Sequence, residues 1–410
     1  MRSSSLLAPF RIRSFRFQYP ADLLTSWGSE MENLILGWYI LAETGSVLLL
    51  TLFGSLQYFG TLIAPMLGMA GDRIGHRAVL CLMRASYTVL ALSLMALAFA
   101  GVLRPVHVFV IAMVAGLIRP SDLAMRSALV ADTMPPDRFV SAMGASRTTS
   151  DSARTVGSLA GAGLFAALGL GRAYIAITAF YLTGFLLTLG VAGSRNVVHL
   201  AQGRSLWRDL REGLAYLWDT PSSQAALWLA FLVNLTAFPM TSGLLPYVAR
   251  DIYHVDQTGL GYLISSFAFG ALMGSILISL VGRAIRPARM MVVFAIAWYA
   301  MLLVFVRMRN PMGGSLTLIA AGLAQSLSLV PMSALLLHGA GAYRGRVMGM
   351  RMLAIYGLPI GLLGAGALID RIGFAPTATL YCVLGIALTL LIAIRWRAAL
   401  WPLHAPANAR

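Results

Sequence analysis

Twelve apolar stretches, each long enough to cross a lipid bilayer as a helix, follow one another along this 410-residue chain. A spanning helix needs roughly 20 mostly apolar residues. The stretches occupy residues 18–43, 46–70, 78–103, 106–131, 139–169, 172–193, 223–249, 258–282, 287–308, 312–338, 346–369 and 374–395. The first is the most polar, because Ser26, Ser29, Glu30, Glu32 and Asn33 interrupt it. The pattern predicts an all-α integral membrane protein with twelve transmembrane helices.

Composition agrees with this interpretation. The chain is 59% hydrophobic and only 11% charged, whereas an ordinary soluble domain is about 45–50% apolar and about 25% charged. A soluble core cannot absorb that excess of apolar residues, but lipid can. The net charge of +16 comes from 31 basic residues, all of them arginine. Since these lie mainly in the short connections, and not on one face of a soluble domain, they argue against nucleic-acid binding.

The distribution of arginine predicts which helix ends face the cytoplasm. With both termini inside, the cytoplasmic segments contain Arg2, Arg11, Arg13, Arg16, Arg73, Arg77, Arg138, Arg195, Arg204, Arg208, Arg211, Arg283, Arg286, Arg289, Arg344, Arg346, Arg395, Arg397 and Arg410. The outer loops contain Arg104, Arg172, Arg250, Arg307, Arg309 and Arg371. Cytoplasmic loops carry the basic excess in membrane proteins, so the asymmetry favours an even number of spans. We expect a monomeric, multi-pass protein of a bacterial inner membrane.

One long connection, at about 194–222, divides the chain into two halves of six spans. Leucines at helical spacing within it predict an amphipathic helix on the inner membrane surface; they are Leu206, Leu210, Leu214 and Leu217. The predicted parts are a cytoplasmic N-terminal segment, a six-helix bundle, a cytoplasmic linker, a second six-helix bundle and a cytoplasmic tail. Their respective ranges are 1–17, 18–193, 194–222, 223–398 and 399–410.

The two halves resemble each other in sequence. Residues 115–129, AGLIRPSDLAMRSAL, align with 321–335, AGLAQSLSLVPMSAL. LAGAG at 159–163 corresponds to LLGAG at 362–366 at a similar offset, close to half the chain length. Internal repeats of this kind are typical of secondary transporters, whose substrate site lies between the repeats near the middle of the membrane.

A short motif joins the second and third spans at residues 68–77, GMAGDRIGHR. It resembles the cytoplasmic loop signature of the major facilitator superfamily, G-x-x-x-D-R-x-G-x-R, through Gly68, Asp72, Arg73, Gly75 and Arg77. We expect Gly68 to let helices approach closely and Gly75 to permit a tight turn. Asp72 can face the positive end of a helix. Arg73 and Arg77 can pair with an acid such as Asp132, which would complete a cytoplasmic gate.

Further stretches resemble one branch of that superfamily, the exporters similar to enterobactin and drug efflux carriers. Residues 344–349 followed by 357–364 are similar to the eleventh span of that branch, and 212–217 to its middle-loop helix. The resemblance covers essentially the whole chain. It implies a two-bundle, alternating-access fold, usually driven by an ion gradient. The antiporter signature of the fifth span is incomplete, because 157–163 has the small residues but lacks the proline.

Charged residues inside the predicted spans are candidates for proton coupling, because intramembrane charges are costly and usually functional. They are Glu30 and Glu32 in span one, Arg119, Asp122 and Arg126 in span four, and Arg147, Asp151 and Arg154 in span five. The spacing places each set of three on one helix face. Four acids and four arginines can pair, and this lowers the cost of burial. A carboxylate in this network could exchange the coupling proton; a static ion-pair lock is the alternative.

Substrate contacts are predicted from the same reasoning. The arginines suit an anionic group, because a guanidinium pairs well with carboxylate or phosphate. Asn33 and Arg119 in the first half, and Asn234 and Gln325 in the second, are the candidate contacts. His338 lies near an inner helix end and could simply be solvated.

The leading prediction is therefore a secondary active transporter for a small amphipathic or anionic molecule, working by proton-coupled efflux. An importer of a nutrient or metal chelate with the same fold is the alternative. The sequence has no nucleotide-binding loop, zinc-protease motif or nucleophile elbow, so we expect neither ATP-driven pumping nor an enzyme. Cys81 and Cys382 show no metal spacing. No cofactor or metal is expected.

Overall fold

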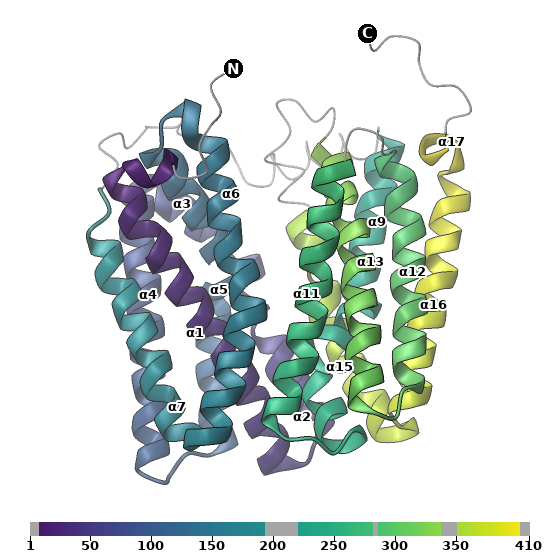
Figure 1. The fold of residues 1–410 in the computed structure, drawn as a ribbon, viewed down its shortest axis with the longest axis horizontal. Helices are drawn as coiled ribbons and strands as arrows, with labels where there is room; N and C mark the ends of the chain where they lie inside the picture. Colours follow the sequence, from purple (N-terminus) through teal and green to yellow (C-terminus); the bar gives the residue numbers. More distant parts are fainter. Residues whose placement is uncertain (1–7, 193–219, 282–285, 338–350, 402–410) are drawn as a thin grey trace. The chain divides into compact units, whose positions relative to one another are not determined.

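The computed structural model describes residues 8–192, 220–281, 286–337 and 351–401. Regular structure within these ranges is helical throughout (Figure 1). The predicted amphipathic helix at 206–217 and His338 lie outside the described residues. Residues 344–349, which resemble part of the eleventh span of the exporter branch, also lie outside the described residues.

Nine described helices are long and apolar enough to cross a membrane, judged by length and composition. One of them runs from Ser141 to Leu189 but is interrupted at Gly169, whose backbone angles are φ 75° and ψ 174°. It therefore forms two of the predicted spans. The first predicted span is a long helix with several charges, and the second is a chain of short helices. The predicted class, an all-α membrane protein of twelve spans, is confirmed.

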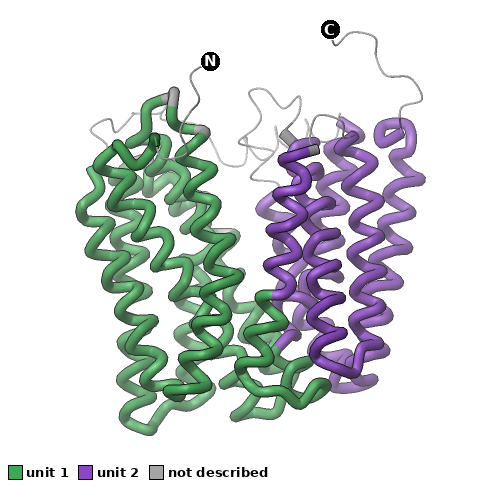
Figure 2. Tube along the Cα trace, in the orientation of Figure 1, with its two compact units in different colours: residues 1–202, 246–265 green, residues 203–245, 266–410 purple. Residues whose placement is uncertain are grey.

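The chain forms two compact units (Figure 2). Unit 1 comprises residues 1–202 and 246–265, and unit 2 comprises 203–245 and 266–410. The helices of unit 1 are α1 (Arg13–Thr44), α2 (Val47–Leu56), α3 (Ala64–Ile74), α4 (His76–Phe99), α5 (Pro105–Thr133), α6 (Pro136–Ser152) and α7 (Ser158–Leu189). A π-helical turn, Ala153–Gly157, joins α6 to α7. Inside this unit α7 packs against α1 and α4, and α5 packs against α4.

Unit 2 is built from the remaining helices. They are α9 (Pro221–Thr236), α11 (Gln257–Val281), α12 (Pro287–Arg307), α13 (Pro311–Leu337), α15 (Gly357–Ile372), α16 (Phe374–Arg395) and α17 (Arg397–Leu400). The part of α11 up to Ser265 belongs to unit 1, as does most of α10 (Leu245–Tyr247). Two π-helical turns, Pro239–Gly243 and Val248–Ile252, interrupt the seventh predicted span. Prolines in that span account for the break, since proline cannot donate a backbone hydrogen bond.

The sequence repeat corresponds to matching packing positions. Gly116 on α5 lies so close to α2 that a Cβ there would overlap a backbone carbonyl oxygen. Gly322, its counterpart, approaches a carbonyl oxygen of α11 in the same way from α13. Gly60 and Gly270 make the reciprocal approaches to α5 and α13. The repeat is therefore retained where helices cross in close contact, and the two halves pack their second and fourth spans alike.

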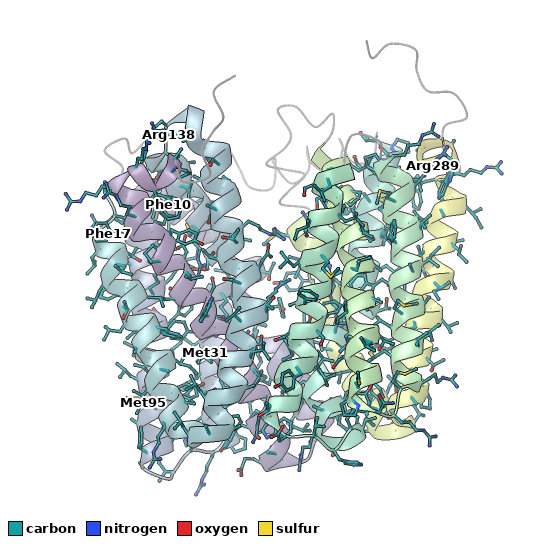
Figure 3. All side chains as sticks on the ribbon, in the orientation of Figure 1. Phe10, Phe17, Met31, Met95, Arg138 and Arg289 are labelled. Atoms are coloured by element: carbon teal, nitrogen blue, oxygen red, sulfur yellow. The ribbon has the colours of Figure 1, made fainter. Side chains whose placement is uncertain are left out.

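Glycines in the fifth and eleventh spans likewise lie where two helices approach closely. Gly161 on α7 packs against Met31, which lies about half-way along α1 (Figure 3). Gly361 on α15 packs against the backbone of Leu235 on α9. Both glycines therefore allow the close helix approach that small residues permit in membrane proteins.

We expect Gly161→Leu to destabilise the protein strongly. A Cβ at residue 161 would lie 2.9 Å from Cα of Met31, so a leucine there must push α7 away from α1, at a cost of roughly 1–3 kcal/mol or more. Gly163→Leu is the matched control, because a Cβ at Gly163 meets no atom within 4 Å. Thermal melting of the detergent-solubilised variants checks the pair. Equal melting temperatures would contradict the close packing.

Candidate functional site

A buried acid in unit 1 is held by groups from two other helices. Glu32 on α1 forms an ion pair through Oε2 with Nη2 of Arg119 on α5. The hydroxyl of Tyr181 donates to the same carboxylate at 2.9 Å, and that of Tyr174 donates at 3.4 Å. Both tyrosines lie on α7, which packs against α1. We call these residues, with Asn33 and Gln57, the Glu32 cluster.

Arg119 is the hub of the Glu32 cluster. Its Nη1 donates to Oδ1 of Asn33 and, at 3.0 Å, to Oε1 of Gln57, while Nη2 pairs with Glu32. The guanidinium therefore contacts one charged partner and two neutral amides. Its side chain is 16% exposed and that of Glu32 is 7% exposed. A charge-assisted pair with so little solvent depends on its partners, because neither charge could be buried alone at low cost.

A second buried group of charges lies elsewhere in unit 1. Asp22 on α1 pairs through Oδ1 with Nη2 of Arg84 on α4, and with Nε of Arg126 on α5 at 3.7 Å. Arg126 also pairs with Asp122 on its own helix and donates to Ser26 at 2.6 Å. We call Asp22, Arg84, Asp122 and Arg126 the Asp22 cluster.

Several polar atoms around the Asp22 cluster are buried without a hydrogen-bond partner among the described residues. They include Oδ1 of Asp122, Nε of Arg84 and the hydroxyl of Tyr87. The ring of Tyr87 packs against Tyr181 of the Glu32 cluster, with centroids 5.6 Å apart. Tyr87 also interacts electrostatically with both Asp122 and Arg119. It therefore lies between the two clusters.

The structure divides the eight charges that were predicted as one network. Arg119 joins Glu32, whereas Asp122 and Arg126 join Asp22. Arg119 and Arg126 share a helix face but belong to different clusters, because residues seven positions apart lie about 10 Å apart along a helix. Four of the eight, Glu32, Arg119, Asp122 and Arg126, therefore belong to two separate clusters instead of one network.

The charges predicted on span five stay outside both clusters. Arg147 and Asp151 approach within 3.7 Å of each other along α6, and their side chains are 71% and 33% exposed. Arg154 is exposed in the π-helical turn. Glu30 has its Cβ against Gly157 and interacts electrostatically with Arg154 and Arg119. Glu30 is therefore the link between span five and the Glu32 cluster.

Sequence reasoning missed half of this arrangement. Arg84 is a charge within the third apolar stretch, and the rule that intramembrane charges are functional would have found it. Asp22 lies at the polar start of the first apolar stretch and was not among the predicted candidates. Tyr174, Tyr181 and Gln57 are residue types common in any span, so nothing in the sequence distinguished them.

The gate motif at 68–77 is partly as expected. Gly75 takes φ 93° in the turn between α3 and α4, as a tight turn requires. Asp132 pairs with Nδ1 of His76 at 2.7 Å, and not with Arg73 or Arg77. Arg77 instead donates to the carbonyl oxygen of Leu189 at the end of α7, where a cation suits the helix dipole.

Two further expectations for the motif have different outcomes. The side chain of Asp72 lies outside the described residues. Gly68 was expected to permit close helix approach, but a Cβ there would meet no atom within 4 Å. That expectation is wrong, because the helix face that carries Gly68 has no close neighbour among the described residues.

The two candidates in unit 2 lie on separate helices. Nδ2 of Asn234 on α9 donates to the carbonyl oxygen of Ala230, one turn earlier, at 2.8 Å. Gln325 on α13 is buried. In the aligned repeats Gln325 occupies the place of Arg119. The second half therefore has a neutral amide where the first has its central cation.

The sequence matches the family model described as Major Facilitator Superfamily over residues 21–364. Among curated proteins, none is similar enough in sequence to match. Solved structures with the same fold include a POT family transporter in complex with 5-aminolevulinic acid, at 12% identity. The likeness covers 95% of this chain and 97% of that one, with a TM-score of 0.75.

Two other solved structures are similar over almost their full lengths. The nucleoside transporter NupG is 12% identical, with 95% of this chain and 100% of that chain covered and a TM-score of 0.70. The human organic anion transporter TETRAN is 16% identical, with 94% and 99% covered and a TM-score of 0.65. At these identities the likeness concerns the fold.

Proposed function

Because the chain belongs to the major facilitator superfamily and is a multi-pass membrane transporter, we propose that it moves a small anionic or amphipathic molecule by proton-coupled, alternating-access transport. The observation that carries the proposal is the buried Glu32–Arg119 ion pair. A carboxylate that exchanges its arginine partner for a proton can couple proton binding to substrate binding.

The solved structures of the same fold support a small-molecule substrate. Those proteins carry or bind nucleosides, 5-aminolevulinic acid and organic anions. An anionic substrate for this chain is our proposal, supported by Arg119 and by the exposed Arg154. Asn33, Asn234 and Gln325 remain the proposed amide contacts.

The remaining parts of the function are proposed from the sequence. The resemblance to drug and siderophore exporters favours efflux, with import of a nutrient or chelate as the second possibility. Arginine asymmetry favours cytoplasmic termini, and the chain length and short loops favour a bacterial inner membrane. The linker at 194–222 would join two six-helix bundles, and the 68–77 loop would act as a cytoplasmic gate.

Proton movement in proteoliposomes of known orientation tests the proposal. A pH gradient is imposed while siderophores, cationic drugs and small organic anions are offered one at a time, and a trapped pH dye is read. We expect at least one compound to move protons through the wild type but not through protein-free liposomes. Proton flux against the substrate supports efflux, and flux with it supports import. A transported compound that moves no protons would contradict coupling.

A further inference from the structure

One end of unit 2 carries arginines but, among the described residues, no acid. At this end α12 begins, α16 ends and α17 follows (Figure 1). Arg289 lies in the first turn of α12, Arg395 is the last residue of α16, and Arg397 is the first residue of α17. From residue 257 to residue 410 the sequence contains a single acid, Asp370. It lies in the last turn of α15, next to the start of α16 and therefore at the opposite end.

Helix packing brings these arginines to the same end of unit 2. α12 packs against α16, and α17 packs against α9. Trp396 fixes the turn between α16 and α17, because its Nε1 donates to Oε1 of Gln224 on α9 at 3.0 Å. The guanidinium of Arg395 lies over the ring of Trp396, 5.5 Å from its centroid. Arg289 is visible at this end in Figure 3. We call Arg289, Arg395, Trp396 and Arg397 the Arg289 patch.

The positive charge of the Arg289 patch is uncompensated in the part of the chain that the structure describes. None of its three guanidinium groups forms an ion pair with a described acid. In addition, Nε of Arg289 is buried and has no hydrogen-bond partner among the described residues. A buried donor without an acceptor is costly. An anion at this position would balance the charge and accept from the free donor.

The corresponding end of unit 1 differs, because it contains acids of its own. Asp132 pairs with a histidine there at 2.7 Å. In the sequence, the offset that relates Gly60 to Gly270 puts Gly282 in the place of Asp72. Arginine enrichment on the cytoplasmic side applies to both halves, so it does not explain why the second half lacks the acid. The absence of acids is therefore a property of unit 2.

Exposed aliphatic side chains continue the patch along both helices. Val293 follows Arg289 by one turn on the same face of α12, and Leu391 precedes Arg395 by one turn on α16. Both aliphatic side chains are exposed. Tryptophan, as at residue 396, is typical of the interface between headgroups and acyl chains. A cation at the helix end with apolar surface one turn deeper matches the two parts of a phospholipid.

We propose that the Arg289 patch binds the phosphate group of an anionic phospholipid such as phosphatidylglycerol, with the acyl chains along Val293 and Leu391. Basic groups between spanning helices bind anionic headgroups, and a guanidinium pairs with phosphate through parallel hydrogen bonds. The N-terminus of α12 adds the positive end of a helix dipole. The lipid thereby supplies the negative charge that unit 1 takes from its own acids. A zwitterionic lipid carries its own cation beside the phosphate, so it should bind less tightly.

Native mass spectrometry of the purified full-length protein tests the proposal. The protein in detergent is titrated with dioleoyl phosphatidylglycerol or dioleoyl phosphatidylcholine, and the lipid-bound fraction is measured. We expect wild type to bind the anionic lipid roughly tenfold more tightly or better. Arg289→Gln and Arg395→Gln/Arg397→Gln should weaken its binding by about fivefold for each arginine removed. Arg289→Lys, which keeps the charge, should lose less than Arg289→Gln.

Arg307→Gln is the matched control, because Arg307 is exposed at the other end of α12. It should bind phosphatidylglycerol as wild type does. Melting temperatures in phosphatidylcholine identify any variant that is misfolded. Phosphatidylglycerol should raise the melting temperature of wild type and leave that of the triple glutamine variant, Arg289→Gln/Arg395→Gln/Arg397→Gln, unchanged.

Four results would overturn the proposal. Wild type could bind the two lipids equally, or a folded triple variant could keep the wild-type preference for phosphatidylglycerol. Arg307→Gln could lose as much affinity as Arg289→Gln, which would make the effect one of net charge. Inorganic phosphate could displace the lipid completely at matched ionic strength, and the patch would then be a site for free phosphate instead of a lipid.

Discussion

Glu32→Gln is expected to abolish proton-driven accumulation of substrate while leaving substrate exchange intact. Glutamine resembles protonated glutamic acid in shape and still accepts from Tyr181, but it cannot release a proton. A pH difference of one unit corresponds to about 1.4 kcal/mol, and hence to about tenfold accumulation for one proton per substrate. The variant should lose that tenfold factor. Accumulation under an imposed pH gradient, compared with counterflow at equal pH, measures both quantities.

Glu43→Gln is the matched control for this variant, because Glu43 is exposed on the same helix. It should accumulate substrate as wild type does. Unimpaired accumulation by Glu32→Gln would refute the role of Glu32. If Glu30→Gln also transports with an intact proton dependence, neither Glu30 nor Glu32 couples the proton.

The spans could be predicted because their signal is local. A run of apolar residues is recognised by its own composition, and the third span, expected at 78–103, is α4 at His76–Phe99. Breaks within spans were not predicted. The second span divides at 57–63 and the seventh passes through π-helical turns. Proline and glycine signal such breaks, but packing decides which of them open the helix.

The candidate site was only partly predictable, because its pairs join residues far apart in sequence. Helical spacing correctly identified Arg119, Asp122 and Arg126 as one face of α5. It could not show that the two ends of that face meet different partners, Glu32 and Asp22. That depends on how α1 crosses α5. Spacing also placed Arg147 on one face with Asp151 and Arg154, although the side chain of Arg147 is exposed on α6.

Arg84→Met is expected to destabilise the protein more than any other single loss of an arginine described above. Arg84 is fully buried and pairs with Asp22, which is also buried. Its guanidinium also donates to Thr188 of α7. Methionine fills similar space, but Asp22 is then left paired with Arg126 at 3.7 Å. Arg126 is also the ion-pair partner of Asp122. Removing one partner of a buried pair costs about 3–5 kcal/mol, or a fall of roughly 10 °C in melting temperature.

The double variant Arg84→Met/Asp22→Asn distinguishes charge from packing. Removing both charges restores neutrality, so it should recover more than half of the lost melting temperature, although it has more substitutions. Arg172→Met, at an exposed position, should melt within a few degrees of wild type. A double variant that is less stable than Arg84→Met would mean that shape, and not charge balance, holds α1, α4 and α7 together. A single variant that melts normally but no longer transports would make the Asp22 cluster part of the transport mechanism.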